Sequence, residues 1–394
     1  MPKISLYNGY HYALCFMAFS FSFPSTFFPF AIGVLALTGV LLRFKTNDKS
    51  IDKQLMVLYL LLFGYMAIRI IGNVDVRYGF RVLERNLPLL LIPLLVIPNK
   101  LKKPKEFYKS FIFGISIAAL IAMIGVGYYQ LFADKEDTGW YFTAIADYGF
   151  HPTYMAMYAL VAIIMLSEKR LFAKRWTMVL NVLLSVFILF TSSRIALITL
   201  FLLIVIKAIV SRKKNFYYAL GLTSVLLVAM FSFSEDFRYK VNQLKDFKGF
   251  SYYDNDNYGS VSVRVAKIKA SILVWKENKW FGNGTGDFRE TLVQKYRSPE
   301  IECWPCARER YNSHNQYLNV LGAYGIIGLL FYGSIIIYLL YKAWKTKNSL
   351  LLGVLFIFLI ISLTESILEV QRGVVIVSFL LYYIPLANRI EDGL

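Results

Sequence analysis

The stretch RERYNSHNQYLNVLGAYGIIGLL, residues 308–330, joins a polar segment to a long apolar run. The apolar part is long enough to cross a bilayer as a helix, and its glycines fit positions where a neighbouring helix approaches closely. His314 and Asn315 come just before this helix, which predicts that they lie at the mouth of a helix bundle, between membrane and water. Histidine exchanges protons near neutral pH, so His314 is a candidate general base. A polar residue that only caps the helix is the simpler alternative.

The composition indicates an integral membrane protein. Hydrophobic residues make up 57% of the 394 positions, and the mean hydropathy is +0.51. Recurrent apolar runs of about 17–25 residues predict helices rather than a barrel of alternating strands. The first run has no evident cleavage site, which favours an uncleaved first span. The net charge is +18, but many of the basic residues cluster at the ends of apolar runs, which favours orientation in a membrane over nucleic-acid binding.

We predict an all-α polytopic membrane helix bundle of about twelve spans. They cover approximately 8–22, 24–42, 54–72, 86–98, 108–132, 152–167, 177–192, 195–210, 216–233, 317–341, 349–366 and 370–387. A basic cluster follows each even-numbered span from the second to the tenth, so the positive-inside rule puts both termini in the cytoplasm. The chain then divides into spans 1–9 (1–233), a large, partly helical periplasmic loop (234–316), and spans 10–12 with a cytoplasmic C-terminus (317–394).

Several arginines lie on the predicted outer side. The loop after the third span holds Arg77, Arg81 and Arg85, and Arg194 stands in TSSRIAL between the seventh and eighth spans. An arginine between two apolar runs must extend to the interface, pair with an acid or bind an anion. We favour anion binding for Arg194, because a guanidinium matches phosphate oxygens in a bidentate way.

The outer loop contains a predicted helix that begins near Arg264. Its apolar positions recur at helical spacing and are Val265, Ile268, Ile272 and Trp275. Arg264, Lys267 and Lys269 cannot share one face, so the helix either packs on the bundle or is a basic helix solvated at the lipid headgroups. The glycines at 282, 284 and 286 favour a tight turn over a phosphate-binding loop, because no strand precedes them and no GK[ST] follows.

The other chemical motifs favour structural roles. Asp254 and Asp256 have a spacing known from metal sites, but their Asn- and Tyr-rich surroundings favour a turn. Cys303 and Cys306 form CWPC on the outer side, where a local disulfide is the leading interpretation. Glu365 and Glu369 flank the turn between the last two spans, where they could form salt bridges with Arg194 or contact the acceptor, and we favour the structural role. No metal or cofactor is predicted.

Together these features resemble the O-antigen ligase family, within the superfamily that also holds the O-antigen polymerases. The resemblance covers roughly residues 80–385. It rests on SSRIAL, on Arg264 followed by Trp275 and the 282–286 glycine turn, and on HNQYLNVLGAYGIIGLL. LERNLPLLLIPL and LTESILEVQRG also resemble parts of the family.

This resemblance implies a GT-C type, inverting and metal-independent glycosyltransferase of the bacterial inner membrane, with its site facing the periplasm. The donor would be a glycan on undecaprenyl pyrophosphate, and the acceptor a hydroxyl of the lipid A core. Arg194 and Arg264 would contact the pyrophosphate, and His314 would activate or position the acceptor. Further substrate contacts are expected from Asn315, His151, Arg85 and Arg81; His151, in YGFHPTY, resembles a His-Pro that precedes the sixth span in relatives.

Two alternatives stay open at the level of sequence. A polymerase would join one lipid-linked repeat to another with the same residues. A lipid or polysaccharide transporter would explain the number of spans, but it should carry polar residues along a path through the bilayer centre, and the sequence has few.

Overall fold

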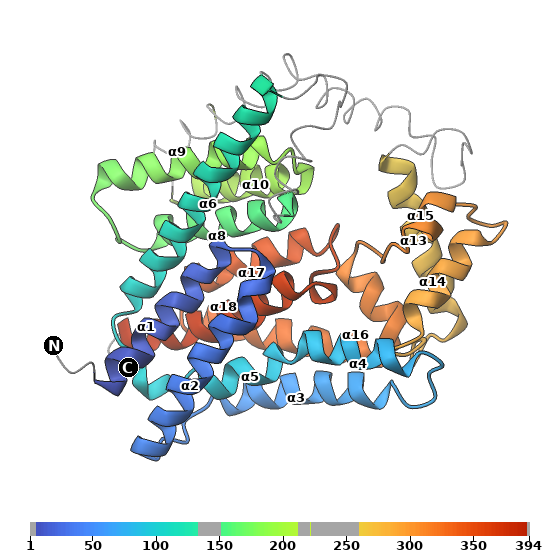
Figure 1. Ribbon diagram of the computed structural model, residues 1–394, viewed down its shortest axis with the longest axis horizontal. Helices are drawn as coiled ribbons and strands as arrows, with labels where there is room; N and C mark the ends of the chain where they lie inside the picture. The colour runs from blue at the N-terminus through green and yellow to red at the C-terminus, as the bar shows by residue number, and fades with distance from the viewer. Residues whose placement is uncertain (1–4, 133–150, 212–220, 222–259, 392–394) are drawn as a thin grey trace.

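The structure is a computed structural model that describes residues 5–132, 151–211, 221 and 260–391 (Figure 1). Within these ranges the chain forms α-helices and short 3-10 helices and no strand, which confirms the all-α prediction for them. The helices of the bundle are α1 (Leu6–Phe19), α2 (Phe28–Thr46), α3 (Lys53–Ile68), α4 (Val76–Asn86), α5 (Pro88–Leu95), α6 (Pro104–Phe132), α8 (Pro152–Glu168), α9 (Lys174–Phe190), α10 (Arg194–Ser211), α16 (Gln316–Lys345), α17 (Ser349–Ile361) and α18 (Gln371–Glu391). The predicted ninth span and the pair Asp254 and Asp256 lie outside the described residues.

Four helical segments in the described ranges are long and apolar enough to cross a membrane: Ser25–Thr46, Pro104–Tyr128, Arg194–Ser211 and Gln316–Lys345. Three shorter apolar helices accompany them: Lys53–Ile68, Pro152–Glu168 and Ser349–Ile361. The length and composition of these helices indicate that the chain is a helical membrane protein. The count of twelve spans stays a prediction.

The centre of the bundle is formed by helices that are apolar on all sides. Almost every residue of α8 is buried, as is most of the described part of α18, which is typical of helices enclosed by other helices. Aromatic side chains join the layers: the rings of Phe107 on α6 and Tyr383 on α18 stack with centroids 3.8 Å apart. Figure 1 shows that α1 begins and α18 ends at the same end of the bundle.

The segment between α3 and α5 corrects the sequence prediction. Residues 76–86, expected to be loop, form the helix α4, and the predicted fourth span is reduced to α5. Asp75 caps α4 by accepting a hydrogen bond of 2.8 Å from the N–H of Tyr78. α5 follows directly with Pro88 at its first position, where the missing N–H costs nothing. Together α4 and α5 return alongside α3 (Figure 1).

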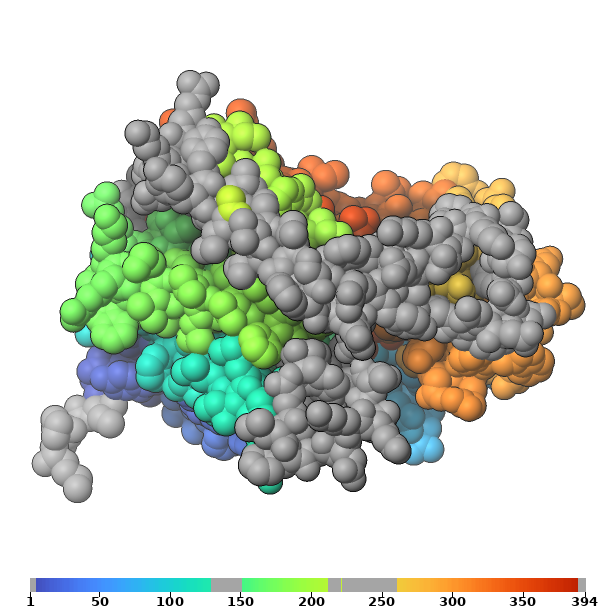
Figure 2. All heavy atoms as spheres, turned by 90° about the horizontal axis from the view of Figure 1, so that it is seen from above, coloured from blue at the N-terminus to red at the C-terminus, as the bar shows by residue number. Residues whose placement is uncertain are grey.

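A lobe of three helices lies at one end of the molecule: α13 (Ser260–Glu277), α14 (Phe288–Arg297) and α15 (Trp304–Arg308). Figure 2 shows it at the end opposite the N-terminal helices. The predicted helix near Arg264 is confirmed as α13, but most of its predicted apolar face is wrong. The residues buried in it are Val265, Ala266, Lys267, Ala270, Ser271 and Val274. Small residues dominate this face because α13 packs against α16.

The glycine loop after α13 is a structural clamp. Gly282 and Gly284 have φ of 71° and 91°, in the left-handed region that favours glycine. The N–H groups of Asn283 and Gly284 donate to the carbonyls of Gly322 and Ala323, each at 2.9 Å. α16 is kinked beside them at Gly325, which has φ 67°. The prediction of a turn rather than a phosphate-binding loop is confirmed, because these N–H groups are engaged by α16.

Cys303 and Cys306 are bonded to each other at the start of α15, as predicted. Both cysteines are buried. Cys306 lies eight residues before His314, so the disulfide constrains the segment that leads to this histidine.

Candidate functional site

His314 occupies a constrained backbone position just before α16. Its φ is 43°, which is uncommon for a residue with a side chain, and its N–H donates to the side-chain oxygen of Asn312 at 3.0 Å. The capping residue is Asn315, whose side-chain oxygen accepts from the N–H of Leu318 at 2.9 Å. The alternative that His314 caps the helix is therefore wrong, and its ring is available for other contacts.

The ring of His314 lies between an aromatic side chain and a carboxylate. Tyr311 meets it edge to face, with centroids 5.9 Å apart and planes at 90°. Its Nδ1 lies 3.9 Å from Oε2 of Glu365, in the connection between α17 and α18. Gln316 fixes this connection: its N–H donates to the carbonyl of Ser362 and its side-chain oxygen accepts from Leu368 N–H, both at 2.8 Å. The approach of Glu365 to His314 is thus set by backbone contacts.

α13 brings two cations to this histidine. Arg264 is exposed and makes no hydrogen bond or ion pair with a described residue. Lys267, three residues later on the same side of the helix, is only 5% exposed. Its amine lies 3.7 Å from the centroid of the Tyr311 ring. The alternative of a basic helix solvated at the lipid headgroups is therefore wrong for Lys267, whose side chain is buried in the protein.

Arg194 is the first residue of α10, after a turn in which Ser192 has φ 51°. The turn places its half-buried guanidinium at the N-terminal end of the helix, where the helix dipole favours anions. The positive charge of Arg264 acts on Arg194. The two arginines are 70 residues apart in sequence, yet the fold brings them into electrostatic range of each other.

Burial and crowded positive charge shift the protonation equilibria of this cluster. Burial, followed by the charges of Lys267 and Arg264, lowers the pKa of His314 to about 3. Burial and Arg264 lower the pKa of Lys267 to about 7. Burial raises the pKa of Glu365 to about 7, against the opposing effect of Arg264 and Lys267. In the free protein His314 is therefore neutral at pH 7.

His151 and Arg289 complete the surroundings of His314. His151 is exposed at the N-terminus of α8, its ring in a T-shaped contact with Tyr154 at 5.3 Å, and its protonated form opposes protonation of His314. Arg289 on α14 also acts on His314, and donates to the carbonyl of Arg310 at 2.8 Å. Asn315, the remaining predicted contact here, donates to the carbonyl of Leu363 at 3.0 Å.

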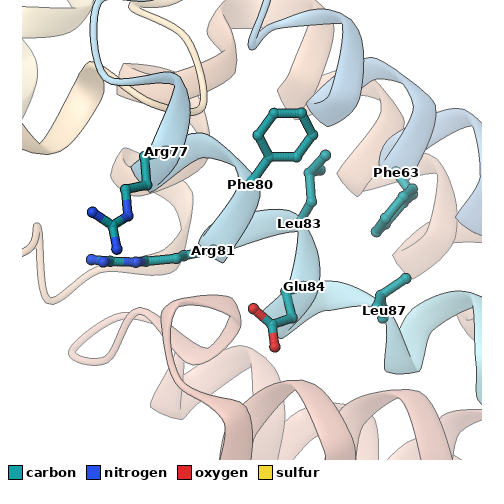
Figure 3. A pocket seen from close by; sticks show the side chains of 7 residues that line it. All are labelled: Phe63, Arg77, Phe80, Arg81, Leu83, Glu84 and Leu87. Carbon is teal, nitrogen blue, oxygen red and sulfur yellow. The ribbon is translucent and has the colours of Figure 1, made fainter.

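The arginines of α4 separate into two environments. Arg85 turns inward and donates to both the carbonyl and a carboxylate oxygen of Glu369, whose other oxygen accepts from Asn319 at 3.0 Å. Glu369 therefore forms a salt bridge, but with Arg85 rather than with the expected partner Arg194. Arg81 lies instead with Arg77 on the edge of a groove of about 520 Å³ between α3 and α4 (Figure 3). Phe63, Phe80, Leu83 and Leu87 supply its apolar side, and Glu84 completes the lining.

The structure adds Lys267 and Glu365 to the residues predicted around His314. Both had been given non-catalytic interpretations. The spacing of Lys267, three residues after Arg264, was a signal that both face the same way. Glu365 carried no comparable signal, because its distance from His314 depends on how α16 and α17 pack. In the described ranges no group of three or more His, Cys, Asp or Glu side chains is arranged to hold a metal ion.

The fold and the cluster define a class: a helical membrane protein with a cationic, histidine-containing site at one end of its bundle, suited to an anionic substrate. The family follows from the comparison with known families. Residues 179–333 match the family described as O-Antigen ligase, which confirms the predicted resemblance over this part of the chain. The match includes Arg194, Arg264 and His314, and supports a function of the O-antigen ligase or polymerase type. A search of curated proteins found no match.

Proposed function

We propose that this protein is an O-antigen ligase. It transfers a glycan from undecaprenyl pyrophosphate to a hydroxyl of the lipid A core in the periplasmic leaflet of the inner membrane, with inversion and without a metal ion. The observation that carries the proposal is the convergence of Arg194, Arg264 and His314 at one end of the bundle, linked by the action of Arg264 on both other residues.

The arginines supply what the departing pyrophosphate needs. Its bond to the sugar breaks with the electron pair moving to phosphate oxygen, so negative charge develops on the leaving group. Arg264 has no competing partner among the described residues, and Arg194 stands at a helix N-terminus. Two guanidinium groups fixed at this place stabilise that charge electrostatically and bind phosphate oxygens in a bidentate way.

His314 supplies the acceptor side of the reaction. With Nδ1 facing Glu365, the nitrogen left to receive a proton from the attacking hydroxyl is Nε2. Attack on the anomeric carbon opposite the pyrophosphate is a single displacement and inverts its configuration. Holding two lipid-anchored substrates in line contributes the remaining rate through proximity and orientation.

Arg81 and Arg85 fit an acceptor path along α4. The groove of Figure 3 has an apolar side suited to acyl chains and an edge of Arg77 and Arg81 suited to phosphate groups of a lipid. Arg85 stands four residues beyond Arg81 on the same side of the helix, toward Glu369 and Asn319. We assign the groove along α4 to the acceptor, and the residues of α10 and α13 to the donor.

The dependence on acceptor tests this function. Purified protein in nanodiscs is mixed with undecaprenyl-pyrophosphate glycan, with and without lipid A core, and products are separated on a gel. We expect one new band that requires the lipid A core. A ladder formed from donor alone would identify a polymerase that uses the same residues, and no product in either mixture would favour a transporter.

A further inference from the structure

Lys267 is a buried lysine whose amine has no counter-ion among the residues that the structure describes. Its side chain is 5% exposed, and no carboxylate of a described residue lies within ion-pair distance of its amine. The amine makes a cation–π contact with Tyr311, 3.7 Å from the centroid of the ring. Burying an ammonium group is costly unless it is paired, so this position calls for an anion that the described part of the protein does not supply.

The groups around Lys267 carry an excess of positive charge. Arg264 acts on it from its own helix, and Glu365, from the α17–α18 connection, is the carboxylate of the described residues that acts on it. His314 is exposed to the same field, with Lys267, Arg264, His151 and Arg289 all opposing its protonation. A histidine held in this field is a poor base, because any proton it accepts adds a further positive charge.

We propose that Lys267 is a third binding residue for the donor pyrophosphate, and that occupation of Lys267 and Arg264 by the donor switches His314 into a working base. This inference rests on the proposed function and adds an order to it: the acceptor hydroxyl is activated only after the donor is in place. The two negative charges of a glycosyl pyrophosphate neutralise the cations that hold His314 unprotonated. As the hydroxyl oxygen bonds to the anomeric carbon, its proton passes to Nε2 of His314, and the sugar–phosphate bond breaks toward the pyrophosphate.

The arrangement explains why the histidine and the lysine share one tyrosine. Lys267 lies over the face of the Tyr311 ring, and His314 makes a T-shaped contact with the same ring, so the two groups are held close to one tyrosine. A donor phosphate that reaches the amine therefore also comes close to the imidazole. The pKa values agree in direction: near neutral pH Lys267 is in part deprotonated when free, and a bound anion restores its proton.

The test uses a sugar pyrophosphate linked to a short prenol as the probe, with affinity measured by calorimetry in detergent at pH 6.5. Lys267→Met keeps the length and apolar stem of the side chain, so we expect folding to be retained. Loss of a charge-assisted hydrogen bond should weaken probe binding about 10- to 100-fold. Glu365→Gln removes the opposing charge and should leave binding equal or tighter. Lys269→Met is the matched control, because Lys269 donates to the carbonyl of Glu300 on the lobe at 2.8 Å.

A second readout follows His314 itself. The chain has 3 histidines, so isotope-labelled histidine gives a simple NMR spectrum in which His314→Ala assigns the signal. We expect His314 to stay neutral from pH 5 to 8 in the free protein and to titrate within this range when the probe is bound. In Lys267→Met without probe, the pKa of His314 should already be higher, because one opposing cation is gone.

The outcomes separate this inference from the function on which it rests. If wild type neither binds the probe nor transfers glycan, the proposed function fails. A different result overturns only the role of Lys267. In that case wild type binds the probe and transfers glycan, Lys267→Met binds the probe like Lys269→Met, and the titration of His314 is the same with and without the probe.

Discussion

Arg264 is the residue on which donor recognition depends most in this account. It is exposed, has no partner among the described residues, and acts on Arg194, Lys267 and His314. A lysine in its place would keep the charge but lose the planar pair of donors. We therefore predict that Arg264→Lys lowers transfer about 10- to 100-fold, the cost of one to two charge-assisted hydrogen bonds.

Initial rates at limiting donor measure this effect. Arg297→Lys is the control, because Arg297 is exposed at the end of α14 on the same lobe. Near-normal transfer by Arg264→Lys would show that charge alone is sufficient at this position, and would remove the bidentate contact from the account.

Individual residues were predicted from sequence where their type conflicted with their surroundings. Arg194 between apolar runs and His314 before a long span are conflicts of this kind, and Arg264 acts electrostatically on both. Lys267 was missed because a lysine in a helix with other basic residues gives no such conflict. Its burial depends on the Tyr311 ring, which lies 44 residues further along the chain.

At the scale of elements, the glycine clamp between α13 and α16 determines where the lobe meets the bundle. A Cβ atom on Gly282 would lie 2.4 Å from the backbone carbon of Ala323, and φ there is 71°. Backbone atoms in a helix cannot move aside as a flexible side chain does. We predict that Gly282→Ala destabilises the protein by more than about 2 kcal/mol, from left-handed strain plus the clash.

Thermal unfolding in detergent measures this loss, with transfer activity followed in parallel. Gly333→Ala is the matched control, because Gly333 lies on α16 with nothing within 4 Å of its added Cβ atom. Equal melting temperatures for both variants would mean that the clamp is not required for stability.

Element types were predicted better than element faces. The apolar runs of α2, α6, α10 and α16 gave their helices directly, because length and hydropathy suffice for a span. α4 was predicted as loop, although Arg77, Arg81 and Arg85 recur every fourth residue, which is a helical period. The buried face of α13 was largely mispredicted, because small residues, rather than large apolar ones, pack against α16.

At the scale of the whole molecule, the account requires the lobe to face the periplasm and both termini to face the cytoplasm. Figure 1 places the first and last helices together at the end away from the lobe. In a Cys15→Ser background, we predict that a membrane-impermeant maleimide labels Glu300→Cys but not Lys49→Cys in cells whose outer membrane is permeabilised. Both positions are exposed, Glu300 on the lobe and Lys49 after α2. The reverse pattern would invert the topology.

A metal-independent reaction is a further prediction for the molecule as a whole. The proposed chemistry assigns the stabilisation of pyrophosphate to arginine and lysine side chains, without a divalent ion. Transfer in nanodiscs should therefore be unchanged by a chelator. If a chelator abolished transfer and a divalent cation restored it, the prediction would be contradicted, and Asp254 and Asp256 would become the candidate metal ligands.

The central claim is that one site divides its work between donor-binding cations and a catalytic histidine. The most direct measurement compares donor affinity and single-turnover transfer in His314→Ala and Arg264→Met, with melting temperature as the check on folding. The account predicts that His314→Ala binds donor like wild type but transfers at least about 100-fold more slowly. It predicts that Arg264→Met loses donor affinity. Normal transfer by His314→Ala, or unchanged donor affinity in Arg264→Met, would contradict it.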